Sequence, residues 1–195
     1  MLFRSPAPLA GRYWNAATIA SSITVALAAN SPLLFGKLLW EETRIPLFEQ
    51  AVEESCPEKR VSFGYGYVQS LEEIFANNNA HYPVILPLAL DTPEEKLPHL
   101  RLHNGTIWRW NRPLIGFDDD GTPHLRIEHR PMAAGPTIPD MIATMAFYYG
   151  LVEWLDMEPH APEFHLPFST AKNNFYNAAR LGLAAHIRSE EHTSE

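Results

Sequence analysis

The chain has 195 residues, of which 46% are hydrophobic and 19% are charged, the proportions of an ordinary globular protein with a substantial core. Its formal net charge is −8, so the broad positive charge that nucleic-acid binding requires is missing and we expect no nucleic-acid partner. The one cysteine, Cys56, excludes an internal disulfide framework and a cysteine-based zinc cluster. We therefore expect a reducing, cytoplasmic location.

The first long element is an apolar stretch, residues 13–36, that contains no charged side chain. Its length would suffice to span a bilayer. However, the stretch is rich in alanine and contains Asn15, Ser21, Ser22 and Asn30, a composition that favours a closely packed helix inside the protein. We predict a buried helix over residues 8–29, ended by the proline that follows, and no membrane contact.

Shorter elements follow in chain order. Residues 46–54 predict a short helix with its proline in the first turn. The alternation of aromatic residues and glycine over 61–68 predicts a strand or loop. Residues 69–78 have apolar side chains at helical spacing and predict a helix, whereas the four prolines of residues 82–98 predict irregular structure.

The second half of the chain predicts a hairpin and two helices. Strands are expected over residues 105–112 and 124–130, joined by a turn at 118–121. Thr137 is predicted to cap a long helix, and a last helix is expected over 169–187. The long helix has an expected buried stripe of Ile138, Met141, Ile142, Met145, Tyr149 and Val152. Helices flanking an antiparallel sheet predict a single α+β unit.

Both ends of the chain are predicted to be foreign sequence. Residues 188–195 match the translation of a common short-read sequencing adapter, and residues 1–5 match the adapter read from the other side. Such ends carry no information about the fold. We therefore expect the biological sequence to comprise residues 6–187.

The predicted strand 124–130 alternates apolar and charged residues. With a two-residue period, Leu125 and Ile127 face one side of the sheet. Arg126, Glu128 and Arg130 face the other side. By itself, this pattern is typical of a solvated strand face with cross-strand ion pairs.

The residues before this strand favour a functional face. The hairpin is expected to bring His103 and Arg112 toward Glu128 and Arg130, so that the four side chains converge on one surface. A carboxylate is a hard oxygen ligand for magnesium, which ATP brings as a complex. Arginine matches phosphate and carboxylate oxygens at two points and stabilises the charge on a transferred phosphoryl group. One strand face also holds two tryptophans, at 108 and 110, which either stack on an adenine or belong to the core.

Several motifs, in order, carry a resemblance to a known family. They are Ala29-Asn30-Ser31-Pro32, His103-x-x-Thr106, Arg112 and Ile127-Glu128-His129-Arg130, with residues 40–50, 134–137 and 147–152. In these motifs the chain resembles glutamate–cysteine ligase family 2 over nearly all of residues 6–187. The resemblance implies the C-terminal part of a catalytic domain with a glutamine-synthetase-like fold, in which an antiparallel sheet lines a funnel for ATP, metal and amino acid.

The resemblance also implies roles for individual residues. Glu128 would bind Mg²⁺, and Arg130 would act in catalysis by contacting the transferred γ-phosphate of ATP. Arg126 would be a further phosphate-binding residue. His103 would lie at the metal–phosphate edge, either as a metal ligand or as a hydrogen-bond partner of the phosphate, since histidine is an unusual ligand for magnesium.

The implied reaction joins two small molecules with ATP. The γ-carboxylate of glutamate becomes an acyl phosphate, and the amine of cysteine attacks it to form γ-glutamylcysteine, a step of glutathione biosynthesis. Arg112 and Arg44 would bind the substrate carboxylate. A different amine acceptor is an alternative, as is a non-catalytic nucleotide- or amino-acid-binding relative, although Glu128 and Arg130 favour an enzyme. The family's N-terminal region carries further metal-binding glutamates that this sequence lacks, so we expect the chain alone to be inactive.

Overall fold

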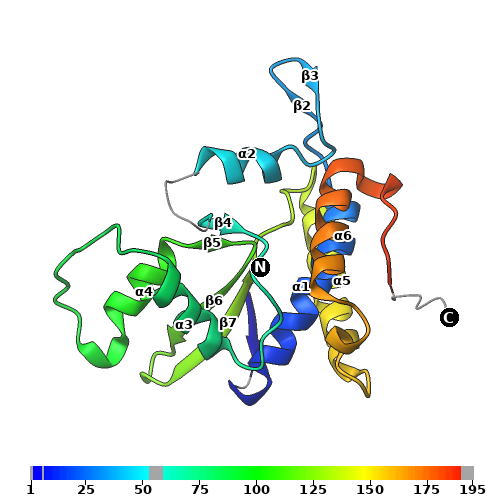
Figure 1. Cartoon of the computed structure of the whole chain (residues 1–195). Helices are drawn as coiled ribbons and strands as arrows, with labels where there is room; N and C mark the ends of the chain where they lie inside the picture. Colours follow the sequence, from blue (N-terminus) through cyan, green and yellow to red (C-terminus); the bar gives the residue numbers. More distant parts are fainter. Residues whose placement is uncertain (1, 6, 53–58, 190–195) are drawn as a thin grey trace.

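The computed structural model describes residues 2–5, 7–52 and 59–189 and has the predicted α+β architecture. In Figure 1, α1, α5 and α6 lie side by side next to the central sheet, and α3 and α4 lie beyond its far side. The elements in chain order are β1 (Leu2–Ser5), η1 (Ala7–Leu9), α1 (Ala10–Ala28), β2 (Leu33–Leu34), β3 (Lys37–Leu38), α2 (Arg44–Ala51), β4 (Val61–Ser62), α3 (Leu71–His81), η2 (Glu94–Lys96), α4 (Pro98–Gly105), β5 (Trp108–Arg109), β6 (Asn111–Phe117), β7 (Pro123–His129), α5 (Ile138–Met157), η3 (Pro162–Phe164), α6 (Phe168–Leu181) and η4 (Gly182–Ala184).

The central sheet is antiparallel, with the strand order β1-β7-β6. The predicted hairpin is β6 and β7. Its turn closes through a hydrogen bond from the Gly121 N–H to the Asp118 carbonyl, 2.9 Å long, and Gly121 has a φ of +88°, a conformation that favours glycine. The sequence did not predict β1, whose backbone pairs with β7 over residues 2–5.

The structure differs from the prediction of a strand over residues 105–112. Pro98 occupies the first turn of a helix, α4, that continues to Gly105, as proline's fixed φ allows. The residues that follow form the short strand β5, which pairs in parallel with β4. The first strand of the hairpin therefore begins only at Asn111.

The predicted buried helix is confirmed as α1, which packs against both α5 and α6. Three of its buried hydroxyls are satisfied within the helix, because those of Thr18, Ser21 and Thr24 each donate to the carbonyl four residues earlier. These hydroxyls can therefore be buried by close packing without being left unpaired. Among the described residues, no helix combines the length and apolar character needed to cross a membrane.

The capped helix is confirmed as α5, and the Thr137 hydroxyl accepts a hydrogen bond from the Asp140 N–H at 3.3 Å. The predicted buried stripe is wrong at four of its six positions. Val152 is buried, and Tyr149 packs at the edge of the core. The remaining members of the stripe, all exposed, are Ile138, Met141, Ile142 and Met145.

The course of α1 explains this exposure. Arg12 near the start of α1 forms an ion pair with Asp156 near the end of α5, with 2.7 Å between Nε and Oδ1. Near the end of α1, Thr24 meets the same histidine, His129, on which Tyr148 stacks. The two helices are thus antiparallel, so α1 ends before it reaches the first turns of α5.

The other predicted helices are found with shifted ends. The helix expected over residues 46–54 is α2, and the one expected over 69–78 is α3. The last helix, expected to continue to residue 187, ends at Leu181 because Gly182 follows with a φ of +53°. Cys56 lies outside the described residues.

Candidate functional site

A cluster of charged side chains lies on the face of the hairpin turned away from α1. Arg112 and Glu128 are direct partners across β6 and β7, and both Nε and Nη2 of Arg112 lie 2.7 Å from Glu128 Oε2. The Nε of Arg130 lies 3.6 Å from the same oxygen. The predicted convergence of these three side chains is therefore observed.

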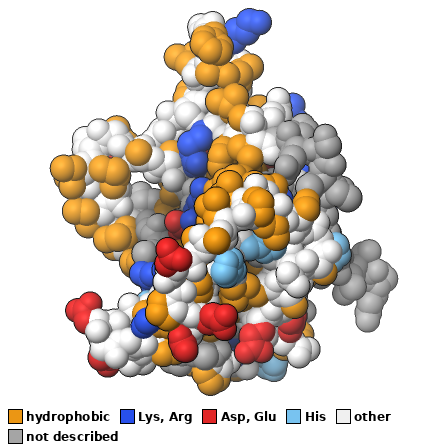
Figure 2. Space-filling model, turned by 90° about the vertical axis from the view of Figure 1, so that its left-hand side faces the viewer, with side chains coloured by type: hydrophobic (Ala, Val, Ile, Leu, Met, Phe, Trp, Pro, Cys, Tyr) orange, Lys and Arg blue, Asp and Glu red, His pale blue; other side chains and the backbone are white. Residues whose placement is uncertain are grey.

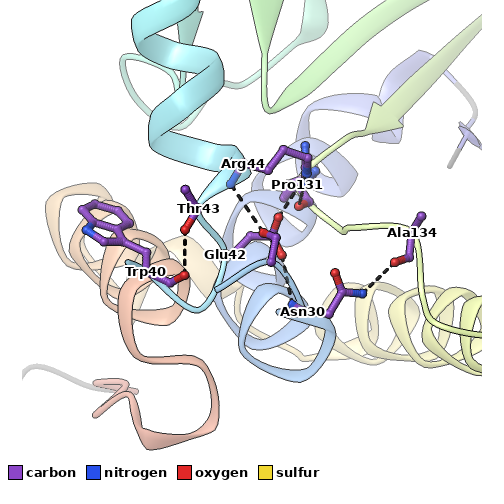
Figure 3. Close-up of polar contacts among 8 residues, drawn as sticks. Asn30, Trp40, Glu42, Thr43, Arg44, Pro131 and Ala134 are labelled. Atoms are coloured by element: carbon purple, nitrogen blue, oxygen red, sulfur yellow. Dashed lines mark hydrogen bonds and ion pairs between the residues drawn. The ribbon is translucent and has the colours of Figure 1, made fainter. Parts of the chain in front are cut away.

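Arg44 joins this cluster from the first turn of α2. Its Nη2 donates to the carbonyl of Pro131, the residue that follows Arg130 (Figure 3). Burial lowers the pKa of Arg130, and the positive charges of Arg112 and Arg44 lower it further, whereas Glu128 raises it. A guanidinium starts from so high a pKa that it stays protonated at neutral pH. The structure thus brings three positively charged side chains together. A negatively charged ligand bound between them would reduce their mutual repulsion.

Aromatic rings support two of these arginines. The Arg130 guanidinium lies 5.7 Å from the centre of the Phe48 ring, and that of Arg44 lies 5.5 Å from the Trp110 ring. Trp110 is buried in the core and donates its indole N–H to Glu49 at 2.8 Å, so it serves as a platform from within the core. Such contacts restrict the guanidinium groups before any ligand binds.

Three loops meet beside the cluster at a buried carboxylate that the sequence analysis did not single out as a site residue. Glu42 is 1% exposed and accepts hydrogen bonds from the Asn30 backbone N–H at 3.2 Å and from Arg44 Nε at 3.1 Å. The Asn30 side chain in turn donates to the Ala134 carbonyl at 2.6 Å (Figure 3). Two of the motifs containing these residues are neighbours in sequence and the third lies about 100 residues later, and the contacts show why they belong together.

Arg126 lies on the same strand face as Glu128, two residues earlier on β7. Its Nε is buried and has no hydrogen-bond partner in the described part of the chain. An unpartnered guanidinium nitrogen suits the phosphate-binding role predicted for Arg126, because an anionic oxygen would satisfy it.

His103 is not brought into contact with Glu128 or Arg130 among the described residues. It lies on α4, where its Nε2 meets the Tyr82 carbonyl at 2.9 Å. It also lines a cavity of about 110 Å³ formed with residues 84–88. The helical course of residues 98–105 removes His103 from the strand that would have faced β7. The link from α4 to the cluster is instead a hydrogen bond from Arg112 Nη1 to the Gly105 carbonyl, 3.3 Å long.

The fit of the site to Mg²⁺ depends on Glu128. Both ion pairs that Glu128 forms with described residues use Oε2, and within that part of the chain Oε1 is left for a cation. In the described part of the chain, no group of three or more His, Cys, Asp or Glu residues is placed to hold a metal ion. Magnesium is often bound through one or two carboxylates, with water and substrate phosphates completing the shell. The site therefore fits magnesium that arrives with a phosphate, whose charge offsets the neighbouring arginines.

One face of the molecule carries a row of basic side chains. Figure 2 shows Lys and Arg side chains lying one below another between two hydrophobic surfaces, with acidic side chains nearby and along the lower part of the view. Positive charge gathered locally on a protein of net charge −8 suits a small anion better than a polyanion.

His129 anchors the end of β7. It lies between Glu128 and Arg130, which are both predicted functional residues. Its side chain points into the core, where Nδ1 meets Asn111 Oδ1 at 2.7 Å and Nε2 meets Thr24 Oγ1 at 3.2 Å. The ring stacks on Tyr148 with 4.0 Å between ring centres. Because strand side chains alternate, fixing His129 inward directs Glu128 and Arg130 outward. This histidine belongs to one of the motifs that carry the family resemblance, but no role was predicted for it.

Burial lowers the pKa of His129 well below its usual value, which predicts a pH dependence of stability. The unfolded chain binds a proton on this side chain below about pH 6.5, whereas the folded chain resists protonation there. The free energy of unfolding is therefore expected to be highest above about pH 6.5 and to fall as the pH drops below that value. Urea unfolding of the wild-type chain and of a His129→Gln variant across this range measures the effect. A fall of the same size in both proteins would show that His129 is not responsible.

The comparison with known families agrees with this geometry. The family model described as glutamate–cysteine ligase family 2 matches residues 10–195, a range that includes Arg44, Arg112, Glu128 and Arg130. No match was found among curated proteins. The charged cluster of the described residues thus lies inside the matched region. The chain belongs to glutamate–cysteine ligase family 2, a family of carboxylate–amine ligases.

Proposed function

We propose that this protein is an ATP- and Mg²⁺-dependent ligase that joins the γ-carboxylate of glutamate to the amine of cysteine. The observation that carries the proposal is the charged cluster on the open face of the hairpin, in which Arg112 and Arg130 contact Glu128 and Arg44 lies near enough to Arg130 to lower its pKa. Family membership supports a ligase. The use of ATP, magnesium, glutamate and cysteine is proposed here in addition to family membership.

The charges of the cluster suit the proposed substrates. Glutamate brings two carboxylates and ATP brings a triphosphate, so both need cations with matching geometry. Arg112 is already engaged by Glu128, whereas the contact of Arg130 with Glu128 is longer, at 3.6 Å. Arg130 is therefore the arginine best placed to exchange this contact for a phosphate oxygen, and Arg126 can support it from the same strand.

In the proposed reaction, the γ-carboxylate oxygen of glutamate attacks the γ-phosphorus of ATP, and ADP leaves. The nitrogen of the amine then attacks the acyl carbon, inorganic phosphate leaves and the amine loses a proton. Negative charge spreads over the phosphoryl oxygens during the first step, where Arg130 would stabilise it. Arg112 and Arg44 would hold substrate carboxylate. When bound, Mg²⁺ neutralises phosphate charge, and Glu128 Oε1 is the oxygen of this chain that would contact it.

With cysteine as the amine, the product is γ-glutamylcysteine and the reaction belongs to glutathione biosynthesis. The experiment measures phosphate release by the complete gene product that carries this sequence, with ATP, Mg²⁺ and glutamate. Cysteine is compared with a panel of other amino acids and simple amines. We expect the highest kcat/KM with cysteine. A preference for another amine would overturn the cysteine assignment, and nucleotide or glutamate binding without phosphate release for any amine would indicate a non-catalytic relative.

A further inference from the structure

We infer that Glu42 is a positioning residue of the anion site, which holds the Arg44 guanidinium so that it faces the ligand beside Arg130. The inference deepens the proposed function and rests on it, because Arg44 is assigned there to an anionic group of a substrate. Glu42 itself is too deeply buried to touch a substrate. It would act through Arg44.

The carboxylate of Glu42 is held in place from its own backbone and from a second loop. The Glu42 N–H donates to the carbonyl of Ala179 on α6 at 2.8 Å. Its side-chain Oε2 accepts from the Asn30 N–H at 3.2 Å, and a bridge pairs Glu42 with Ser31. Because the backbone of Glu42 and its Oε2 are both fixed, its second oxygen, Oε1, is a rigidly placed hydrogen-bond acceptor.

That other oxygen, Oε1, is the one that meets Arg44. The Arg44 side chain is 39% exposed, whereas that of Glu42 is 1% exposed, so one end of the ion pair lies in the protein and the other at the surface. Nε of Arg44 is bound by Glu42 and Nη2 by the Pro131 carbonyl (Figure 3). In the described part of the chain, this leaves Nη1 as the nitrogen of Arg44 without a hydrogen-bond partner.

This arrangement orders the Arg44 side chain before the ligand binds. A long arginine side chain near the surface samples many rotamers, and ordering it on binding costs conformational entropy. A buried carboxylate at Nε, a carbonyl at Nη2 and the Trp110 ring below the guanidinium remove that freedom before the ligand arrives. The ligand is an anionic oxygen group, either a carboxylate of the amino acid or a phosphate of the nucleotide.

The experiment compares Glu42→Gln with the matched variant Glu41→Gln in the complete gene product. Both changes remove one carboxylate from adjacent positions, but Glu41 is exposed whereas Glu42 is buried. We expect Glu42→Gln to raise the KM of one substrate about 10- to 100-fold, the scale of one charge-assisted hydrogen bond, while Glu41→Gln leaves both KM values within about twofold. Measuring KM separately for glutamate and for ATP shows which anion Arg44 receives.

A double-mutant cycle separates positioning from a merely structural role. If Glu42 acts through Arg44, then Glu42→Gln adds almost nothing to the KM once Arg44→Gln is present. Glu42→Asp keeps the charge on a shorter side chain and replaces Glu42→Gln in the experiment if the glutamine variant does not fold. The expected KM of Glu42→Asp lies between those of the wild-type protein and Glu42→Gln. An unchanged KM for both substrates, or an equal rise with and without Arg44, would overturn the inference. A wild-type protein with no phosphate release would instead refute the proposed function.

Discussion

Replacing Arg130 by alanine in the complete gene product is expected to lower turnover by orders of magnitude, about 100- to 1,000-fold, because a fixed cation facing developing negative charge contributes on this scale. Folding is expected to stay intact. Among the described residues, the side chain contributes only a 3.6 Å contact to Glu128 and a ring contact to Phe48. The hydrogen bond from the Arg130 backbone N–H to the Trp110 carbonyl, 2.9 Å long, does not depend on the side chain.

Steady-state phosphate release and thermal unfolding, measured on the same preparation, check this prediction. Arg101→Ala is the matched control, since Arg101 is exposed and its guanidinium lies beside the Phe117 ring, outside the charged cluster. Arg130→Lys keeps the charge but loses the planar guanidinium group, so its turnover should lie between those of Arg130→Ala and Arg101→Ala. Turnover of Arg130→Ala equal to that of Arg101→Ala would remove this arginine from the mechanism.

Among the substitutions proposed here, replacing His129 by alanine is expected to lower the free energy of unfolding most, by about 3 kcal/mol. The loss comes from the cavity left behind and from the buried polar groups left unpaired. The imidazole is the common partner of Thr24 and Asn111, and it covers the face of Tyr148. Asn111 keeps its hydrogen bond to Ser21 Oγ at 3.0 Å, but its Oδ1 loses the histidine.

Urea unfolding of the chain above about pH 7, where the unfolded histidine is neutral, measures this loss without the pH effect described above. The control is His186→Ala, because His186 is exposed near the end of the described chain and its removal should change the free energy of unfolding by less than about 0.5 kcal/mol. A loss below about 1 kcal/mol for His129→Ala would mean that α1 and α5 do not depend on this histidine for their attachment to β7.

The sequence was informative wherever a structure depends on residues a few positions apart. The alternation along residues 124–130 follows from the two-residue period of a strand, and it correctly separated Ile127 in the core from Glu128 and Arg130 on the open face. The helix start at Thr137 is likewise local, because the cap and the N–H group that it satisfies are three residues apart. The family resemblance, which rests on such short motifs, agrees with the match to the family model.

Local patterns failed where two structures compete for the same residues or where a partner element ends. Residues 98–105 contain no strong period, and proline at their start allowed a helix that carried His103 away from β7. The apolar stripe of α5 has a correct helical period. However, periodicity does not reveal the length of the neighbour, and α1 ends before it can cover Ile138 and Met141.

The chain's own sequence determined the family, the long helices, the hairpin turn and the outward face of β7, because each depends on short-range spacing or on side-chain chemistry. Only the tertiary structure brought Arg44 to Arg130 and Glu42 to Asn30, and only it stacked His129 on Tyr148. These contacts join separate elements of the chain. Their geometry depends on the packing of α1 against the sheet and the other helices, which the spacing of residues within a single segment does not encode.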